Sequence, residues 1–207
     1  KTKWDAGQIW RSFLVLIKSI VFYIFDSIVM LENSVSKKNS KKSIVLIRQD
    51  AIGDFIIWLD TAKEYRKLNP PDEYEIILVG NELWYDLAKE LPHWDKVIPV
   101  NFHKFKTISR YRRYILKQIK NLQADIAIQP TFSREFYHGD SLARASGAFR
   151  KVSSSGDMSN RNRLKKWLAN RWHTELIPAT NNSLTELERN AEFFSFLSGE
   201  AYHCVYP

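Results

Sequence analysis

Short apolar, β-branched runs that alternate with longer helical stretches are the feature that most limits what this chain can fold into. We predict strands at residues 44–48, 74–80, 96–100 and 124–130, with a fifth at 150–154. The helices predicted after them cover residues 54–68, 81–91, 106–122 and 140–148, with Asn81 as an N-cap. A βαβα order implies a parallel sheet with helices on both faces. The predicted fold class is therefore α/β, a Rossmann-like open parallel sheet.

Two later segments complete the predicted organisation. The small, polar residues of 153–163 are typical of a mobile surface loop. Residues 183–199 predict a helix, because Ser183 and Glu186 have the spacing of a capping box and Gly199 is a typical helix end.

Composition limits the partners and the compartment. With 207 residues and 44% hydrophobic content, the chain can bury one good α/β core or two small ones. Its 31 Lys and Arg against 23 Asp and Glu give a net charge of +8, which favours an anionic partner such as nucleic acid, a phosphorylated substrate or an acidic membrane surface. Cys204 is the single cysteine, so an intramolecular disulfide and a Cys-based zinc site are excluded and a reducing compartment is expected.

The first 42 residues differ from the rest and form a separate segment, an apolar helix followed by a basic linker. Residues 9–31 are almost wholly apolar, but Arg11, Lys18 and Asp26 fall on one side of a helix and argue against simple insertion across a bilayer. With the polybasic residues 36–42, this pattern predicts an amphipathic helix in the interface of an anionic membrane. The alternative is a helix packed on the domain or on a second subunit.

The motif RQDAIGD, residues 48–54, lies where the first strand ends and the first helix begins. In an open parallel sheet this is the carboxyl edge, where ligands bind. Gly53 allows a tight turn or a close approach of substrate, and Asp54 stands at the helix start, where it is either a cap or a catalytic group. Neither the dinucleotide-binding nor the P-loop fingerprint is present, so the turn is not a standard nucleotide site.

The same residues resemble a known family. Five segments, in order over residues 42–199, look like the N-terminal half of glycosyltransferase family 9. They are KSIVLIRQDAIGDFIIWL, YEIILVG, LAKELPHWDKVIPV, LQADIAIQPTFSRE and SLTELERNAEFFSFLSG. That family contains the bacterial heptosyltransferases of lipopolysaccharide core assembly. The glycine–aspartate turn is the most specific element of the resemblance.

The resemblance implies a GT-B architecture, in which residues 43–207 form the acceptor-side domain and a C-terminal donor domain is absent from this chain. A nucleotide-sugar such as ADP-heptose would be the co-substrate, with no cofactor and no metal. Asp54 would be the general base of an inverting transfer, and we expect no sugar transfer by these residues alone. The chain departs from the family at Asp50, a second carboxylate that caps the turn, pairs with Arg48 or holds an acceptor hydroxyl.

Basic residues supply a second indication. Between Asp95 and Asp125 the chain has eight cations and no acid, which suits a glycan or lipid-linked acidic acceptor or, alternatively, a solvated helix face. Ser133 and Arg134 follow the fourth predicted strand and are the next candidates for acceptor contact, with His138 just beyond them.

Three functions are compatible with these patterns. The first is the acceptor domain of a glycosyltransferase, which we expect to be cytoplasmic and peripheral on the inner face of the cytoplasmic membrane. The second is a membrane-associated, non-catalytic docking domain of the same fold. The third is a nucleic-acid-binding module, which rests only on charge and aromatic content; because it lacks a recognisable reader motif, nucleic acid is not the expected partner.

Overall fold

The computed structural model describes residues 6–33, 40–180 and 183–204, and within them it contains a six-stranded sheet whose neighbouring strands are all parallel. The strands are β1 (Lys42–Arg48), β2 (Tyr74–Asn81), β3 (Lys96–Val100), β4 (Ile126–Gln129), β5 (Arg150–Ser154) and β6 (Glu175–Ile177). Their spatial order, β3-β2-β1-β4-β5-β6, is that of a Rossmann sheet. The predicted fold class is confirmed.

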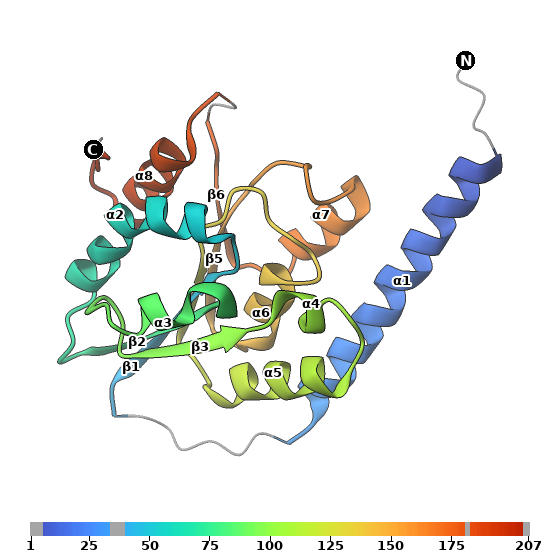
Figure 1. Ribbon diagram of the computed structural model, residues 1–207, viewed down its shortest axis with the longest axis horizontal. Helices are drawn as coiled ribbons and strands as arrows, with labels where there is room; N and C mark the ends of the chain where they lie inside the picture. The colour runs from blue at the N-terminus through green and yellow to red at the C-terminus, as the bar shows by residue number, and fades with distance from the viewer. Residues whose placement is uncertain (1–5, 34–39, 181–182, 205–207) are drawn as a thin grey trace.

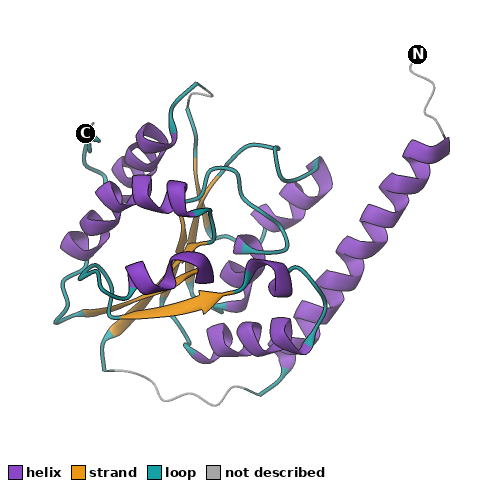
Figure 2. Cartoon of the chain, viewed as in Figure 1, coloured by secondary structure: helices purple, strands orange, loops and turns teal. Residues whose placement is uncertain are grey.

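Helices cover both faces of this sheet (Figures 1 and 2). The α2 helix (Ile52–Leu68), the 3₁₀ turn η1 (Glu82–Trp84), α3 (Tyr85–Ala88) and α8 (Glu186–Ser198) pack on one face. On the other face lie α1 (Ala6–Leu31), α4 (Phe102–Phe105), α5 (Arg110–Asn121) and α6 (Gly139–Ala145). The remaining helix, α7 (Arg163–Asn170), packs beside α1 through a small cluster of buried side chains.

The two-sided cover explains the continuous apolar runs in the sequence. In β1, Ile44 and Leu46 face α2 and α8, whereas Val45 and Ile47 face the side that α5 and α6 cover. Successive side chains of a strand point to opposite faces, so a strand buried on both sides carries no polar alternation. The carboxyl end of β1 is thereby held at the centre of the sheet, between β2 and β4.

The C-terminal half of α1 packs on the domain. Asp26 is buried and receives two hydrogen bonds from Arg112 of α5, from Nε at 2.7 Å and from Nη2 at 2.5 Å. Phe22 packs on Tyr137 with tilted rings whose centroids are 4.6 Å apart, and the Ser19 and Tyr137 hydroxyls are 2.9 Å apart. Of the two alternatives for this helix, packing on the domain is therefore present in the structure, while membrane contact stays a prediction.

Four local predictions need correction. The helix predicted at 106–122 begins later, as α5 at Arg110, because Ser109 caps it there; the short helix α4, capped by Asn101, lies just before the predicted range and was not predicted. The helix predicted at 81–91 begins as the 3₁₀ turn η1, although Asn81 does cap it by accepting a hydrogen bond from the Leu83 backbone N–H.

The capping box of α8 is formed by Thr185 and Glu188, two residues after the predicted pair, while Gly199 ends the helix as predicted, with φ of 77°. The segment 153–163 is only partly a surface loop. Its first two residues belong to β5, and Arg161 is buried in an ion pair with Asp140.

Candidate functional site

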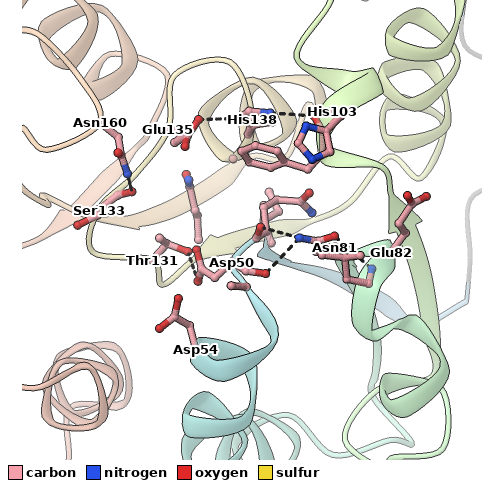
Figure 3. A pocket seen from close by; sticks show the side chains of 17 residues that line it. Asp50, Asp54, Asn81, Glu82, His103, Thr131, Ser133, Glu135, His138 and Asn160 are labelled. Carbon is pink, nitrogen blue, oxygen red and sulfur yellow. Dashed lines mark hydrogen bonds and ion pairs between the residues drawn. The ribbon is translucent and has the colours of Figure 1, made fainter.

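A cavity of about 350 Å³ opens at the carboxyl edge of the sheet, next to the turn between β1 and α2. Polar side chains from the segments that follow β1, β2, β3, β4 and β5 converge on it (Figure 3). The lining residues that carry chemistry are Gln49, Asp50, Asp54, Asn81, Glu82, His103, Gln129, Thr131, Ser133, Glu135, His138 and Asn160. The site is therefore where the sheet topology predicts ligand binding.

Asp54 reaches the cavity from the first turn of α2 (Figure 3). The N-cap of this helix is Ala51, and no side chain caps it through a hydrogen bond. Asp54 is half-buried, and within the described part of the chain its carboxylate makes no hydrogen bond and no ion pair. A cap would engage its oxygens with backbone N–H groups. The structure instead leaves the carboxylate directed at the cavity, so capping does not account for it.

Asp50 also lines the cavity, but its carboxylate is engaged. Its Oδ2 atom lies 2.5 Å from Nε of the buried Arg48, and Thr131 Oγ1 donates to the same oxygen at 3.4 Å. Arg48 also donates to Glu186 of α8 at 2.7 Å. The expected pairing of Asp50 with Arg48 is thus present. Through Arg48, the pair connects the turn after β1 to α8. The two carboxylates of the turn therefore differ: in the described part of the chain Asp50 is paired, whereas Asp54 is not.

Burial and neighbouring charge act in opposite directions on this group of side chains. Burial raises the pKa of Glu186 above its ordinary value, and the Arg48 guanidinium offsets only part of this increase. Burial also lowers the pKa of Arg48, but Asp50 and Glu186 outweigh it and raise that pKa. Arg48 therefore stays charged while fully buried, and it holds Asp50 and Glu186 near the end of β1.

The segment after β4 divides its side chains between the cavity and the interior. Ser133 and Glu135 face the cavity, whereas the intervening Arg134 is fully buried and donates to Asp140 at 2.8 Å and to the Ser154 carbonyl at 2.6 Å. These two hydrogen bonds hold the Arg134 side chain in the interior, between its two neighbours at the cavity. Of the two candidates for acceptor contact, Ser133 is at the cavity and Arg134 is not.

Glu135 and His138 form a fixed pair at the cavity. Nδ1 of the buried His138 lies 2.7 Å from Glu135 Oε2, and Nε2 lies 3.3 Å from the Phe102 carbonyl oxygen. The imidazole also stacks on the Phe102 ring, with centroids 4.0 Å apart. The hydrogen bond with His138 lowers the pKa of Glu135 below its ordinary value. Glu135 is consequently a positioned carboxylate.

Of two glycines near the site, the structure requires one to be glycine and not the other. A Cβ at Gly80 would lie 2.0 Å from the Trp84 ring, so glycine lets this indole stack on Phe55 and donate to the Asp50 carbonyl at 3.0 Å. A Cβ at Gly53, in contrast, would meet nothing within 4 Å. The turn itself therefore does not require glycine at position 53, and close approach of a substrate stays a prediction.

The charge of the cavity lining is negative. Asp50, Asp54, Glu82 and Glu135 contribute carboxylates, and no lysine or arginine is among the lining side chains. Hydroxyl and amide groups alternate with these acids, which suits a neutral polyol that donates hydrogen bonds. Phosphate or carboxylate groups of an acidic acceptor would lie outside this cavity. One carboxylate without a partner, beside groups that bind hydroxyls, can accept a proton from a bound hydroxyl group.

Sheet order and the position of this cavity define the class of fold, a Rossmann-like α/β domain with its site at the carboxyl edge of the sheet. Solved structures make the fold more specific. The chain is similar to E. coli heptosyltransferase WaaC with ADP-2-deoxy-2-fluoro heptose, at 14% identity and a TM-score of 0.60 over 79% of this chain and 50% of that one. It is similar to the glycosyl transferase family 9 structure from Veillonella parvula DSM 2008, at 15% identity and a TM-score of 0.60 over 84% of this chain and 48% of that one.

A third similar structure is E. coli ADP-heptose lps heptosyltransferase II, at 12% identity and a TM-score of 0.53 over 77% of this chain and 40% of that one. The chain thus has a family 9, heptosyltransferase-like fold and spans about half the length of these structures. Its sequence matches no protein-family model and no curated protein.

Sequence reasoning missed eight polar residues of the cavity and counted His138 as neither a base nor a metal ligand. The missed residues are Gln49, Asn81, Glu82, His103, Gln129, Thr131, Glu135 and Asn160. For two of them a signal was available, because Gln129 and Thr131 stand at the end of β4 as Asp50 stands after β1. For Asn160 none was, since its place follows from a hydrogen bond to the Ser133 carbonyl across a loop.

Proposed function

We propose that this chain is the acceptor-binding domain of an inverting glycosyltransferase that transfers heptose or a similar sugar from a nucleotide-sugar to a cell-envelope glycan or lipopolysaccharide core acceptor. One observation carries the proposal: Asp54 is a carboxylate without a partner, at the carboxyl edge of the sheet, in a cavity lined by hydroxyl-binding groups. The similarity in fold to structures of family 9 supports it.

In the proposed reaction an acceptor hydroxyl lies in the cavity, and its oxygen attacks the anomeric carbon of the donor sugar. Asp54 takes the hydroxyl proton as the new C–O bond forms. The bond between the anomeric carbon and the diphosphate breaks, and the nucleoside diphosphate leaves with the electron pair. A single displacement inverts the configuration at that carbon. A carboxylate is a weak base in water, so exclusion of water by a facing donor domain would strengthen it.

The remaining residues have supporting roles in this proposal. Gly53 leaves room for the acceptor beside Asp54, since nothing occupies the position of its absent Cβ. Asp50 and Ser133 offer an acceptor oxygen and a hydroxyl to sugar hydroxyls. Arg134, which lies in the interior, would act by fixing the loop that carries Ser133 and Glu135.

The test is release of nucleoside diphosphate from ADP-heptose and other nucleotide-sugars, measured in a protein that contains this domain together with a donor-binding domain. Asp54→Asn should lower kcat by roughly a hundredfold or more, because the proton acceptor is lost. Asp72→Asn is the matched control, since Asp72 is an exposed carboxylate in the turn before β2 and does not line the cavity. Glu135→Gln tests whether Glu135, another carboxylate of the cavity, is the proton acceptor instead of Asp54.

Unchanged kcat in Asp54→Asn, with an unchanged unfolding midpoint, contradicts the assignment of the base. If Glu135→Gln alone abolishes turnover, Glu135 is the base instead. Turnover by residues 1–207 without a donor domain contradicts the division of labour that we propose. Absence of any turnover, with acceptor binding retained, favours the alternative function, a non-catalytic docking domain.

A further inference from the structure

The two charged groups of α1 whose side chains the structure describes face the domain, which leaves an apolar surface on the outer side of the helix. Asp26 is buried against Arg112, and Lys18 Nζ lies 5.3 Å from the centre of the Tyr137 ring. Seen from outside, the helix presents large exposed apolar side chains: Trp10, Phe13, Leu14, Val15, Leu16, Ile17, Ile20, Val21, Tyr23, Ile24, Ile28 and Leu31. A contiguous surface of this kind is unusual on a soluble monomer and marks an interaction site.

The α7 helix extends this surface. Its side chains Leu164 and Trp167 are exposed, Trp167 by 56%, and the guanidinium of Arg171 lies 3.6 Å from the centre of the Trp167 ring. Between the two helices runs an apolar groove of about 410 Å³, lined from α1 by Leu16, Ser19, Ile20 and Tyr23 and from the other side by Phe136, Leu164, Lys165 and Leu168. We name the exposed apolar side chains of α1 and α7, with this groove, the α1–α7 face.

Charge on this face has one sign. In residues 6–31 the only carboxylate is Asp26, which is buried, and residues 158–174 contain none. Arg163, Lys165 and Arg171 supply positive charge on the α7 side. Glu32, the first residue after α1, is paired with Arg113 and Lys117 of α5. Apolar and aromatic side chains bordered by cations, without exposed acids, are complementary to the interface of an anionic bilayer.

We propose that the α1–α7 face docks on the surface of an anionic lipid bilayer, with α1 lying in the interface and α7 as a second contact. This proposal does not depend on the proposed sugar transfer. By length and composition, Phe13–Leu31 could cross a membrane, and only 22% of that stretch is buried. Spanning nevertheless conflicts with the packing of the helix.

From Ser19 onward one side of α1 is held by the domain, through Ser19, Phe22, Asp26 and Val29. The part of α1 before Ser19 is about 13 residues, or roughly 20 Å at 1.5 Å per residue, against a hydrocarbon core of about 30 Å. Spanning would therefore draw the polar helix α5, which packs against α1, into the lipid (Figure 1). A helix in the interface keeps α5 in water.

Vesicle flotation with the 207-residue chain tests the proposal. We expect the chain to float with phosphatidylcholine vesicles that contain about 30% phosphatidylglycerol, to float weakly with phosphatidylcholine alone, and to be released by alkaline carbonate. Ile17→Glu with Ile24→Glu should lower binding by at least roughly tenfold, because both residues lie on the outer side of α1. Lys165→Glu with Arg171→Glu should lower it by a similar factor.

Trp167→Glu isolates the contribution of α7 and should weaken binding severalfold, whereas an anchor made of α1 alone would leave it unchanged. Leu68→Glu is the matched control, because Leu68 is an exposed apolar residue at the end of α2, on the opposite face of the sheet. Of these side chains Lys165 is half-buried and the others are exposed, so circular dichroism and the urea midpoint should match those of the wild type.

Three outcomes would overturn the proposal. Resistance to carbonate extraction would show a spanning helix. Equal flotation of the Ile17→Glu, Ile24→Glu variant and the wild type would show that α1 does not contact lipid. A dimer in light scattering that this variant dissociates, together with no flotation of the wild type, would show that a second copy of the chain covers the face.

Discussion

Asn in place of Asp26 should cost the protein about 3–5 kcal/mol of unfolding free energy, because it leaves a buried guanidinium without its counter-charge. Arg112 is fully buried, and Asp26 of α1 is its only carboxylate partner among the described residues. Its other hydrogen bonds go to neutral groups: the Phe105 and Tyr137 carbonyls at 2.8 Å each and Ser141 Oγ at 2.9 Å. These bonds orient the guanidinium but do not neutralise it.

Urea unfolding followed by tryptophan fluorescence and far-UV circular dichroism measures the effect. With a slope of about 2 kcal/mol per molar urea, the midpoint should fall by roughly 2 M. Asp26→Leu with Arg112→Met should recover much of the loss, because apolar residues of similar volume avoid the desolvation of both charges. Glu32→Gln is the control at the end of the same helix, where the pairs with Arg113 and Lys117 are exposed to solvent and a small effect is expected.

A fall of less than about 1 kcal/mol would refute this reasoning, provided that α1 stays docked. Limited proteolysis decides that condition. If α1 undocks, Arg112 reaches water and cleavage within residues 6–31 becomes faster while the unfolding of the sheet is unchanged. If α1 stays docked and the midpoint does not move, the buried ion pair contributes nothing measurable.

Two further predictions concern the interior. Burial alone would raise the pKa of Asp140, but Arg134, His173 and Arg161 outweigh it and lower that pKa below 3.8, while burial lowers the pKa of His173 below 6.5. The free energy of unfolding should therefore fall as the pH drops below 6.5, where His173 takes up a proton more readily in the unfolded chain, and again below 3.8, where Asp140 does so. If the His173→Gln variant loses as much stability between pH 6.5 and pH 3.8 as the wild type, His173 is not responsible for the first decrease. Gly80→Ala should lower the free energy of unfolding by about 1–3 kcal/mol, because the added methyl group displaces the Trp84 ring. Gly53→Ala should leave the urea midpoint near that of the wild type. If the two variants have equal midpoints, the close approach of Trp84 to Gly80 is contradicted.

The central strands could be predicted because their signal is local. A strand buried on both faces needs a continuous apolar run, and β1 to β4 have one within two residues of the predicted bounds. β6 was missed, since its three residues, Glu175–Ile177, carry no pattern of their own and are ordered by pairing with β5. α7 was missed because it follows the polar segment 153–163, and its Asn162 cap lies inside that segment.

For the candidate site, position along the chain was sufficient to predict some of the cavity residues but not others. Asp50, Asp54 and Ser133 could be found because each follows a strand whose carboxyl end must lie at one edge of a parallel sheet. Which way a loop side chain points depends on contacts made elsewhere. Arg134 points inward because Asp140 binds it there, and that pairing cannot be derived from spacing.

Asp26 shows the same limit more sharply and connects the two surfaces of the molecule. In the sequence it argues against simple insertion across a bilayer, yet Arg112 neutralises it from 86 residues away, so the outer side of α1 stays apolar. Arg112 also holds the Tyr137 carbonyl, in the segment whose Glu135 and His138 line the cavity. The ion pair that docks α1 thus also fixes one wall of the candidate site. Loss of Asp26 should consequently weaken membrane docking and acceptor binding together, although Asp26 touches neither lipid nor acceptor.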